Sequence, residues 1–397
     1  TTKEPHAGSL TGETTKEPHA GSLTGETTKE PHAGSLTGET TKELHARSLT
    51  GETTKELHAM AELPSVGPAL REAVRRLEPG TRGVAEYHFG WVDADGRPSG
   101  DDPAGGGKGV RARLALLSAR AAGAPPEVGL PGAVAVELLH NFSLVHDDVL
   151  DGDVQRRHRR TVWAVFGVPA AILTGSALQA LALEVVLDPP TPAGAAAADL
   201  LSKTTRVLIG GQYEDLAFER RTSVTVAECL DMAAGKTGAL VVASAAVGAV
   251  LAGADPRTVD ALKAYGAHVG LAFQLEDDLL GIWGDPAVTG KPALADLRAR
   301  KKSLPVAAAL AAGGPAADRL RSWLATPAPP PEQVVDDLAE LRGIAELVEA
   351  AGGRAWVAAE AEREVERAER ALAGAPVDPV AAAEMVALAR ALLGRTA

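Results

Sequence analysis

The chain has 397 residues, enough for one large domain or two ordinary ones, and its low aromatic content of 3% favours packed helices over a β-sandwich. Forty Lys and Arg against 52 Asp and Glu leave a formal net charge of -12, so a nucleic-acid partner is not expected. The single Cys229 excludes an intrachain disulfide and a cysteine-cluster metal site, and it fits a reducing compartment such as the cytoplasm.

The first 59 residues are a tandem repeat. The sequence TTKEPHAGSLTGE recurs from Thr1 in near-identical copies and breaks off before Met60. Because each early copy has a single Leu, it cannot bury enough apolar surface to offset chain entropy. We therefore expect residues 1–59 to be disordered and residues 60–397 to form the folded domain. Met60 is the expected natural start of the protein, with a flexible recruitment tail as the alternative.

The folded part has the pattern of an all-α protein. Segments rich in Ala, Leu, Arg and Glu alternate with breaks rich in Gly and Pro, at 93–109, 188–194, 326–331 and 374–379. No convincing stretch alternates with period two, so we expect a large helical bundle. The longest uncharged stretch, Thr161–Leu183, is long enough to span a bilayer but contains Gly167, Pro169 and Gln179. We expect it to be a helix buried in the bundle, with no integral membrane segment.

The clearest sign of chemistry is the acidic sequence DDVLD, Asp147–Asp151, at the end of an apolar helix that opens at Pro131. Asp147 and Asp151 are i, i+4 neighbours, so their carboxylates converge on one face of the helix. Converging carboxylates repel each other unless a hard cation neutralises them, and Mg²⁺ binds to one or two carboxylates together with substrate phosphate. The alternative, an exposed acidic helix end, is disfavoured by the helix dipole.

A second acidic sequence, QLEDD at Gln274–Asp278, closes another apolar helix that begins near Asp260. We expect the two acidic ends to face each other across a cavity and to hold several Mg²⁺ ions. His146 precedes the first motif, where it either orients an Asp or packs in the core. Asp336–Asp337 is assigned no role, since the helix dipole explains acids near a helix N-terminus.

Cationic residues follow or precede both acidic motifs. GGKGVR at Gly106–Arg111 is a Gly-rich turn that enters a helix and suits a diphosphate, and Gly235-Lys236-Thr237 interrupts another apolar helix. Neither Gly–Lys pair is a P-loop, because a P-loop has a Gly five residues before the Gly that precedes its Lys, and neither Gly107 nor Gly235 has one. Each cation alone is typical of a surface, but together they indicate a site for anions. The cations are Lys108, Arg111, Arg156, Arg157, Lys236, Lys291 and Lys301.

These motifs, in this order, resemble those of the trans-isoprenyl diphosphate synthases (polyprenyl synthetases). GGKGVR is similar to the GGKxxR of that family, DDVLD to its first Asp-rich motif, and GKTG to its Lys-Thr motif. GGQYEDLAFE at 210–219 resembles its GQxxD sequence, and residues 273–305 resemble its second Asp-rich region and the tail that follows. The resemblance implies an all-α bundle of the class I isoprenoid synthase type with a central cavity, and a homodimer.

The resemblance also implies a role for each matched residue. About three Mg²⁺, or Mn²⁺ in their place, would be held on an allylic diphosphate by Asp147, Asp151 and Asp277. The same diphosphate would contact Arg156, Lys236, Lys291 and Lys301. The diphosphate of isopentenyl diphosphate would contact Lys108, Arg111, His140 and Arg157. Gln212 matches a further substrate-binding position, Thr237 and Gln274 lie beside the developing allylic cation, and the acidic motifs are completed by Asp148 and Asp278.

The implied reaction is Mg²⁺-assisted ionisation of the allylic diphosphate, condensation with isopentenyl diphosphate, and loss of a proton. Chain length in such enzymes is set just before the first acidic motif. Here Phe142 is followed by the small Ser143, which resembles the pocket floor of short-chain synthases that stop at geranylgeranyl diphosphate. Farnesyl diphosphate would be expected if Ser143 were also aromatic.

Some positions depart from the family pattern. Gly281 stands where the second motif usually ends in Asp, so we expect a weakened rather than an inactive enzyme. His158, Arg160 and Ser176 also differ, which bears on specificity. Two other interpretations stay open: a class I terpene cyclase of the same fold, and a non-catalytic subunit that regulates an active synthase.

Overall fold

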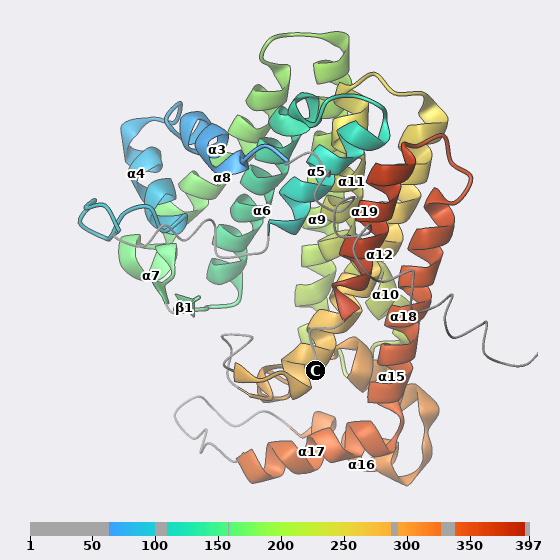
Figure 1. Cartoon of the computed structure of the whole chain (residues 1–397). Coiled ribbons are helices and arrows are strands. Elements are labelled where there is room, and N and C mark those ends of the chain that lie inside the picture. The colour runs from blue at the N-terminus through green and yellow to red at the C-terminus, as the bar shows by residue number, and fades with distance from the viewer. Residues whose placement is uncertain (1–62, 100–108, 158, 287–292, 327–337, 394–397) are drawn as a thin grey trace, which may run out of the picture. The chain divides into compact units, whose positions relative to one another are not determined.

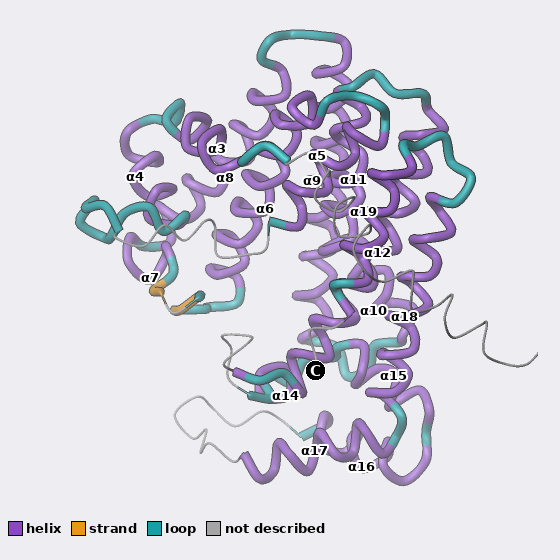
Figure 2. The backbone as a smooth tube through the Cα atoms, in the orientation of Figure 1, coloured by secondary structure: helices purple, strands orange, loops and turns teal. Residues whose placement is uncertain are grey.

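The computed structural model describes residues 63–99, 109–157, 159–286, 293–326 and 338–393, within one compact unit, Glu62–Ala397. The predicted repeat segment, residues 1–59, lies outside the described residues, as do Lys108, His158, Lys291 and Asp336–Asp337. The described residues are almost entirely helical, as the tube in Figure 2 shows, which confirms the all-α prediction.

The helices in chain order begin with α3 (Val66–Val74), α4 (Pro79–His88), α5 (Val110–Ala121), α6 (Leu130–Leu150), α7 (Val162–Phe166) and α8 (Val168–Leu187). They continue with α9 (Pro192–Glu219), α10 (Val226–Ala233), α11 (Ala239–Leu251), α12 (Pro256–Trp283), α14 (Ala295–Arg298), α15 (Leu304–Ala312), α16 (Gly314–Ala325), α17 (Leu338–Ala350), α18 (Gly353–Leu372) and α19 (Pro379–Arg390). A 3-10 turn at Pro126–Gly129 precedes α6, and a π-turn at Ala234–Gly238 joins α10 to α11.

The two strands of the described residues form a hairpin directly after α6. β1 (Gln155–Arg156) pairs antiparallel with β2 (Arg159–Arg160), with Gln155 opposite Arg160. The Tyr87 hydroxyl of α4 donates a hydrogen bond to the Arg160 carbonyl at 2.8 Å, and the Arg159 guanidinium lies 4.7 Å from the centre of the Tyr87 ring. The hairpin is therefore anchored to α4 as well as to α6.

α11 lies in the middle of the bundle and packs against α5, α6, α9 and α12. Its buried side chains are mostly small, and Gly248 approaches α5 so closely that a Cβ there would lie 2.0 Å from the Ala115 carbonyl oxygen. Small residues on α11 thus let its neighbours approach at short interaxial distance. In Figure 1 the C-terminal ends of α6 and α12 both point toward the lower part of the view, where β1 and α15 lie.

Helix starts follow the sequence signals, but one helix end differs from the prediction. α6 has Pro131 in its first turn, as predicted, and α12 opens at Pro256, where the Asp255 side chain caps the Arg257 N–H. α12 then continues through Gly281 to Trp283 instead of ending at the second acidic motif, and it ends at Gly284, whose backbone is extended.

The expectation for the long uncharged stretch was wrong in part. The stretch is two helices, α7 and α8, since Gly167 has φ 85° and Pro169 follows it in the first turn of α8. α8 is only partly covered: Leu173 is 63% exposed. By length and composition alone, three helical segments of the described residues could cross a membrane: Pro126–Leu150, Val168–Leu187 and Val226–Leu251.

Candidate active site

The first acidic motif lies at the junction of α6 and the hairpin. Asp151 caps α6 and donates its N–H to the Asp147 carbonyl at 2.8 Å, so both residues keep helical geometry and share a face. Burial raises the pKa of Asp147 to about 6, with the Asp151 carboxylate adding to the rise and the Lys236 ammonium opposing it. A cation between Asp147 and Asp151 would relieve this electrostatic cost.

Asp148, the middle acid of the motif, is used differently. Its side chain is buried, and its Oδ1 accepts a hydrogen bond from Arg156 Nε at 2.6 Å. Burial raises the pKa of Asp148, and the Arg156 charge opposes the rise. Asp148 therefore anchors the hairpin and fixes the orientation of the Arg156 side chain.

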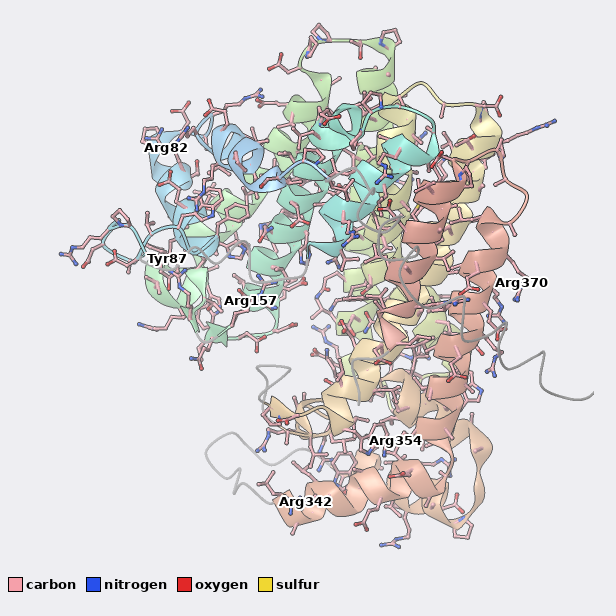
Figure 3. The ribbon with its side chains drawn as sticks, in the orientation of Figure 1. Arg82, Tyr87, Arg157, Arg342, Arg354 and Arg370 are labelled. Carbon is pink, nitrogen blue, oxygen red and sulfur yellow. The ribbon has the colours of Figure 1, made fainter. Side chains whose placement is uncertain are left out.

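A second group of cations surrounds His140 on α6. Arg111 Nη1 lies 3.4 Å from His140 Nε2, and Arg157 lies near the C-terminal end of α6 (Figure 3), with φ 50°. Burial, together with the charges of Arg111 and Arg157, lowers the pKa of His140 well below its ordinary value, so this imidazole is neutral at pH 7. Two guanidinium groups and a neutral imidazole suit one diphosphate.

The π-turn brings Lys236 and Thr237 to the site. Lys236 Nζ contacts Asp215 Oδ2 of α9 at 2.5 Å. The contact between α9 and the π-turn requires Gly211, because a Cβ at that position would lie 2.2 Å from the Lys236 backbone nitrogen. The predicted interruption of an apolar helix is therefore a π-turn, a feature that occurs often at functional sites.

A chain of hydrogen bonds joins the π-turn to α12 and α15. Thr237 Oγ1 donates to Gln274 Oε1 at 2.5 Å, and Gln274 Nε2 donates to Asp278 Oδ1 at 2.8 Å. Asp278 Oδ2 accepts the Leu304 N–H at the start of α15 at 2.8 Å. Burial and the Asp296 carboxylate raise the pKa of Asp278 to about 7, while these hydrogen bonds oppose the rise. Because both oxygens are engaged, Asp278 fixes the orientation of the Gln274 amide.

A cleft open to solvent lies beside this chain. The residues that line it come from α9, the π-turn, α12 and the segment before α15, and include Asp215, Lys236, Gln274, Asp278, Lys301 and Ser303. The Ser303 Oγ and the amide of the buried Gln212 have no hydrogen-bond partner among the described residues. The cleft thus combines cations with the unsatisfied Ser303 hydroxyl, while Gln212 lies on α9 outside its lining.

The carboxylates suit Mg²⁺, which also takes substrate phosphate and water as ligands, better than they suit a metal ion whose ligands all come from the protein. Among the described residues, no group of three or more His, Cys, Asp or Glu could hold a metal ion together. Mg²⁺ does not need such a cage, since one or two carboxylates suffice when substrate phosphates and water complete its octahedron. Asp147 and Asp151 on α6 could supply one such pair of oxygen ligands, and the half-buried Asp277 on α12 could supply another.

The structure also places the predicted chain-length residues and adds residues that were not predicted. Phe142 is buried and makes an edge contact with the His146 ring at 5.0 Å, while Ser143 Oγ donates to the His140 carbonyl. The predicted site residues included neither Glu137 nor Asp215, although Asp215 is the acid of the matched GQxxD sequence. Glu137 lies three residues before His140, on the same helix face, and Asp215 lies three residues after Gln212, so helical spacing could have found both.

The chain is similar to known proteins over most of its length. The sequence model of the polyprenyl synthetase family matches residues 101–341. The (2E,6E)-farnesyl diphosphate synthase of Mycobacterium tuberculosis strain H37Rv is 51% identical over 332 residues, which cover 84% of this chain and 91% of that protein. The geranylgeranyl diphosphate synthase of the same strain is 42% identical over 332 residues, covering 83% of this chain and 91% of that protein.

The fold comparison gives the same result. The crystal structure of a polyprenyl synthetase from Streptomyces coelicolor A3(2) matches with a TM-score of 0.79 and 53% sequence identity, covering 82% of this chain and 96% of that chain. The chain belongs to the polyprenyl synthetase family, and its fold is the all-α class I isoprenoid synthase fold. It is a prenyl diphosphate synthase, as the motifs predicted.

Proposed function

We propose that the chain condenses isopentenyl diphosphate with an allylic diphosphate to form a short all-trans prenyl diphosphate, with Mg²⁺, or Mn²⁺ as a substitute, as cofactor. One observation supports this most: cations gather in two places, Arg111 and Arg157 around His140, and Lys236 and Arg156 beside the acids of α6, with Arg156 acting on both. Two neighbouring cation groups suit two diphosphates. A terpene cyclase has one diphosphate substrate and would not need the group around His140.

The residues divide the chemistry between them. When bound, about three Mg²⁺ would neutralise the charge that develops on the departing diphosphate. Asp147, Asp151 and Asp277 would hold these ions, and Lys236 and Arg156 would contact the same diphosphate. Arg111, His140 and Arg157 would hold the diphosphate of isopentenyl diphosphate with its alkene facing the allylic carbon. The hydrogen-bonded Thr237 and Gln274 would present oxygen atoms to the developing allylic cation, so no Ser, Cys or His nucleophile is required.

We propose geranylgeranyl diphosphate as the product. Phe142 would form the pocket floor, supported from below by the His146 ring, whose Nε2 lies 3.1 Å from the Ile172 carbonyl of α8. Ser143 keeps its hydroxyl on its own helix and adds little bulk. The similarity to a farnesyl diphosphate synthase makes farnesyl diphosphate the rival product.

Replacing Phe142 with Ala is expected to lengthen the product by one or more isoprene units, because it removes the floor of the pocket. Product length is read by chromatography of the dephosphorylated alcohols. Leu144→Ala, on the same helix, is the matched control and should leave product length unchanged. Unchanged products from Phe142→Ala would mean that the floor lies elsewhere.

We also propose a homodimer in the cytoplasm. Large apolar side chains are exposed on the adjacent helices α8 and α9, and burying them against a second copy would be energetically favourable. These side chains are Ile172, Leu173, Val207, Ile209 and Tyr213. Leu173→Glu is expected to convert a dimer into a monomer, as measured by light scattering after size exclusion. Val380→Glu, at an exposed apolar residue of α19, is the control and should stay dimeric.

The proposed function is tested by incubating the purified chain with farnesyl diphosphate, isopentenyl diphosphate and Mg²⁺. We expect geranylgeranyl diphosphate, formed only when both substrates are present. Product from farnesyl diphosphate alone would indicate a cyclase. No extension of farnesyl diphosphate, but formation of it from geranyl diphosphate, would correct the product to farnesyl diphosphate. No product from any primer, with stimulation of an active synthase, would indicate a regulatory subunit.

A further inference from the structure

Gly281 stands where the second acidic motif lacks its last acid, and a side chain from a neighbouring helix occupies the space beside it. A Cβ built at Gly281 would lie 2.2 Å from Asp296 Oδ2 and 2.5 Å from its Cγ. Real Cβ atoms do not approach other atoms so closely, so any side chain at position 281 would force the Asp296 carboxylate of α14 to rotate out of its present place. Because position 281 is one helical turn beyond Asp277, the Asp296 carboxylate lies near the face of α12 that carries Asp277.

The backbone around Asp296 then reverses direction. α14 is a single turn, entered through Leu294 at φ 58° and left through Arg300 at φ 50°. The Lys301 N–H donates to the Asp296 carbonyl at 2.9 Å, which closes the loop and places Lys301 at the cleft that Lys236 also lines. Two non-glycine residues with positive φ are uncommon within one short segment, and they produce the reversal.

The electrostatics agree with this arrangement. Desolvation acts to lower the pKa of Lys301, but the carboxylates of Asp296, Asp215 and Asp278, with Asp296 the strongest, outweigh it and hold the pKa above its ordinary value. Asp296 therefore lies against α12 at Gly281 and acts electrostatically on Lys301, a cation of the cleft.

We propose that Asp296 is a positioning residue that holds the Lys301 ammonium toward the allylic diphosphate, and that Gly281 is required to admit its carboxylate. This inference rests on the proposed function for the identity of the diphosphate. It also replaces the expectation that Gly281 weakens the enzyme: an acid at 281 would displace Asp296, so Gly281→Asp should lower activity and not raise it.

The test is a double-mutant cycle. Asp296→Ala and Gly281→Ala are each expected to raise the KM for the allylic diphosphate by about 10-fold, as is typical when a supporting residue is lost, with the KM for isopentenyl diphosphate within about 2-fold. In the Asp296→Ala background, Gly281→Ala should add less than about 2-fold, because the space is then empty. In a Lys301→Gln background, Asp296→Ala should also add little, because it acts through Lys301.

Binding of inorganic pyrophosphate with Mg²⁺, measured by calorimetry, gives a readout that does not depend on turnover, and it should weaken by the same factor. Asp318→Ala, an exposed acid on α16, is the control and should change nothing. An unchanged allylic KM and pyrophosphate affinity in Asp296→Ala would overturn the inference, as would equal rises for both substrates. If the wild-type chain makes no prenyl product, the proposed function fails, and the pyrophosphate titration still decides the role of Asp296.

Discussion

Asp147→Asn is expected to lower kcat/KM for prenyl transfer by roughly 1,000-fold while making the metal-free protein more stable at pH 8. The loss of activity follows because a neutral amide cannot hold a divalent cation on the leaving diphosphate, a contribution worth several kcal/mol. Activity is measured from the rate of product formation at saturating Mg²⁺. A variant that keeps more than a tenth of the wild-type value would remove Asp147 from the site.

The gain in stability follows from the sign of the pKa shift. The carboxyl of Asp147 ionises near pH 3.8 in the unfolded chain but at about pH 6 in the folded protein. The folded state therefore loses stability relative to the unfolded state as the pH rises from 4 to 6, and above pH 6 the loss is complete. Asn carries no such cost, so we expect a gain of about 1–2 kcal/mol at pH 8 after allowing for solvent screening, and none at pH 4.

Unfolding in urea with a chelator present, at pH 8 and at pH 4, measures this gain. Asp260→Asn, at an exposed residue of α12, is the matched control and should change stability little at either pH. If Asp147→Asn is no more stable than the wild type at pH 8, then Asp147 is not held in the electrostatically costly position that a cation would relieve.

Gly211→Ala is expected to destabilise the protein by about 3 kcal/mol and to lower kcat by about 100-fold. The added Cβ would lie 2.2 Å from the Lys236 nitrogen and 2.7 Å from the Gly235 carbonyl carbon. Both atoms belong to the backbone and cannot rotate away, so α9 and the π-turn must separate. Lys236 and Thr237 move with that turn, and displacement of about 1 Å at catalytic groups costs about 100-fold in rate.

Gly210→Ala is the control, since a Cβ at that position meets nothing within 4 Å on the same helix. It should be neutral or stabilise the helix by up to about 1 kcal/mol, because Ala has the higher helix propensity. Urea unfolding and initial rates are measured for both variants. Equal behaviour of the two would show that the contact of α9 with the π-turn does not position Lys236.

Local sequence signals predicted the helices and the placement of Asp147 and Asp151 on one helix face. Pro131 begins α6 as expected, and the i, i+4 spacing of Asp147 and Asp151 is that of one helix face. These features depend on residues close together in the chain, where capping and periodicity apply. The ion pair of Asp148 with Arg156 could not be read this way, because it depends on where the hairpin folds back.

Long-range contacts explain the other differences. Nothing in the sequence near Gly281 shows that Asp296 fills its space, since Asp296 comes 15 positions later and lies on a separate helix, α14. The uncharged stretch was expected to be buried, but hydrophobicity does not distinguish a surface that packs within one chain from one that packs against a second copy. In our proposal, α8, on which Leu173 is largely exposed, packs against a second copy of the chain.

The most direct test of the central claim is the binding of Mn²⁺, followed by electron paramagnetic resonance, with and without inorganic pyrophosphate. In our account, the acids of α6 and α12 hold cations only together with a diphosphate. We therefore expect Mn²⁺ to bind weakly in the absence of pyrophosphate and much more tightly in its presence. Both Asp147→Asn and Asp277→Asn should abolish this increase. Mn²⁺ binding that is indifferent to pyrophosphate, or an increase that survives in either variant, would contradict the account.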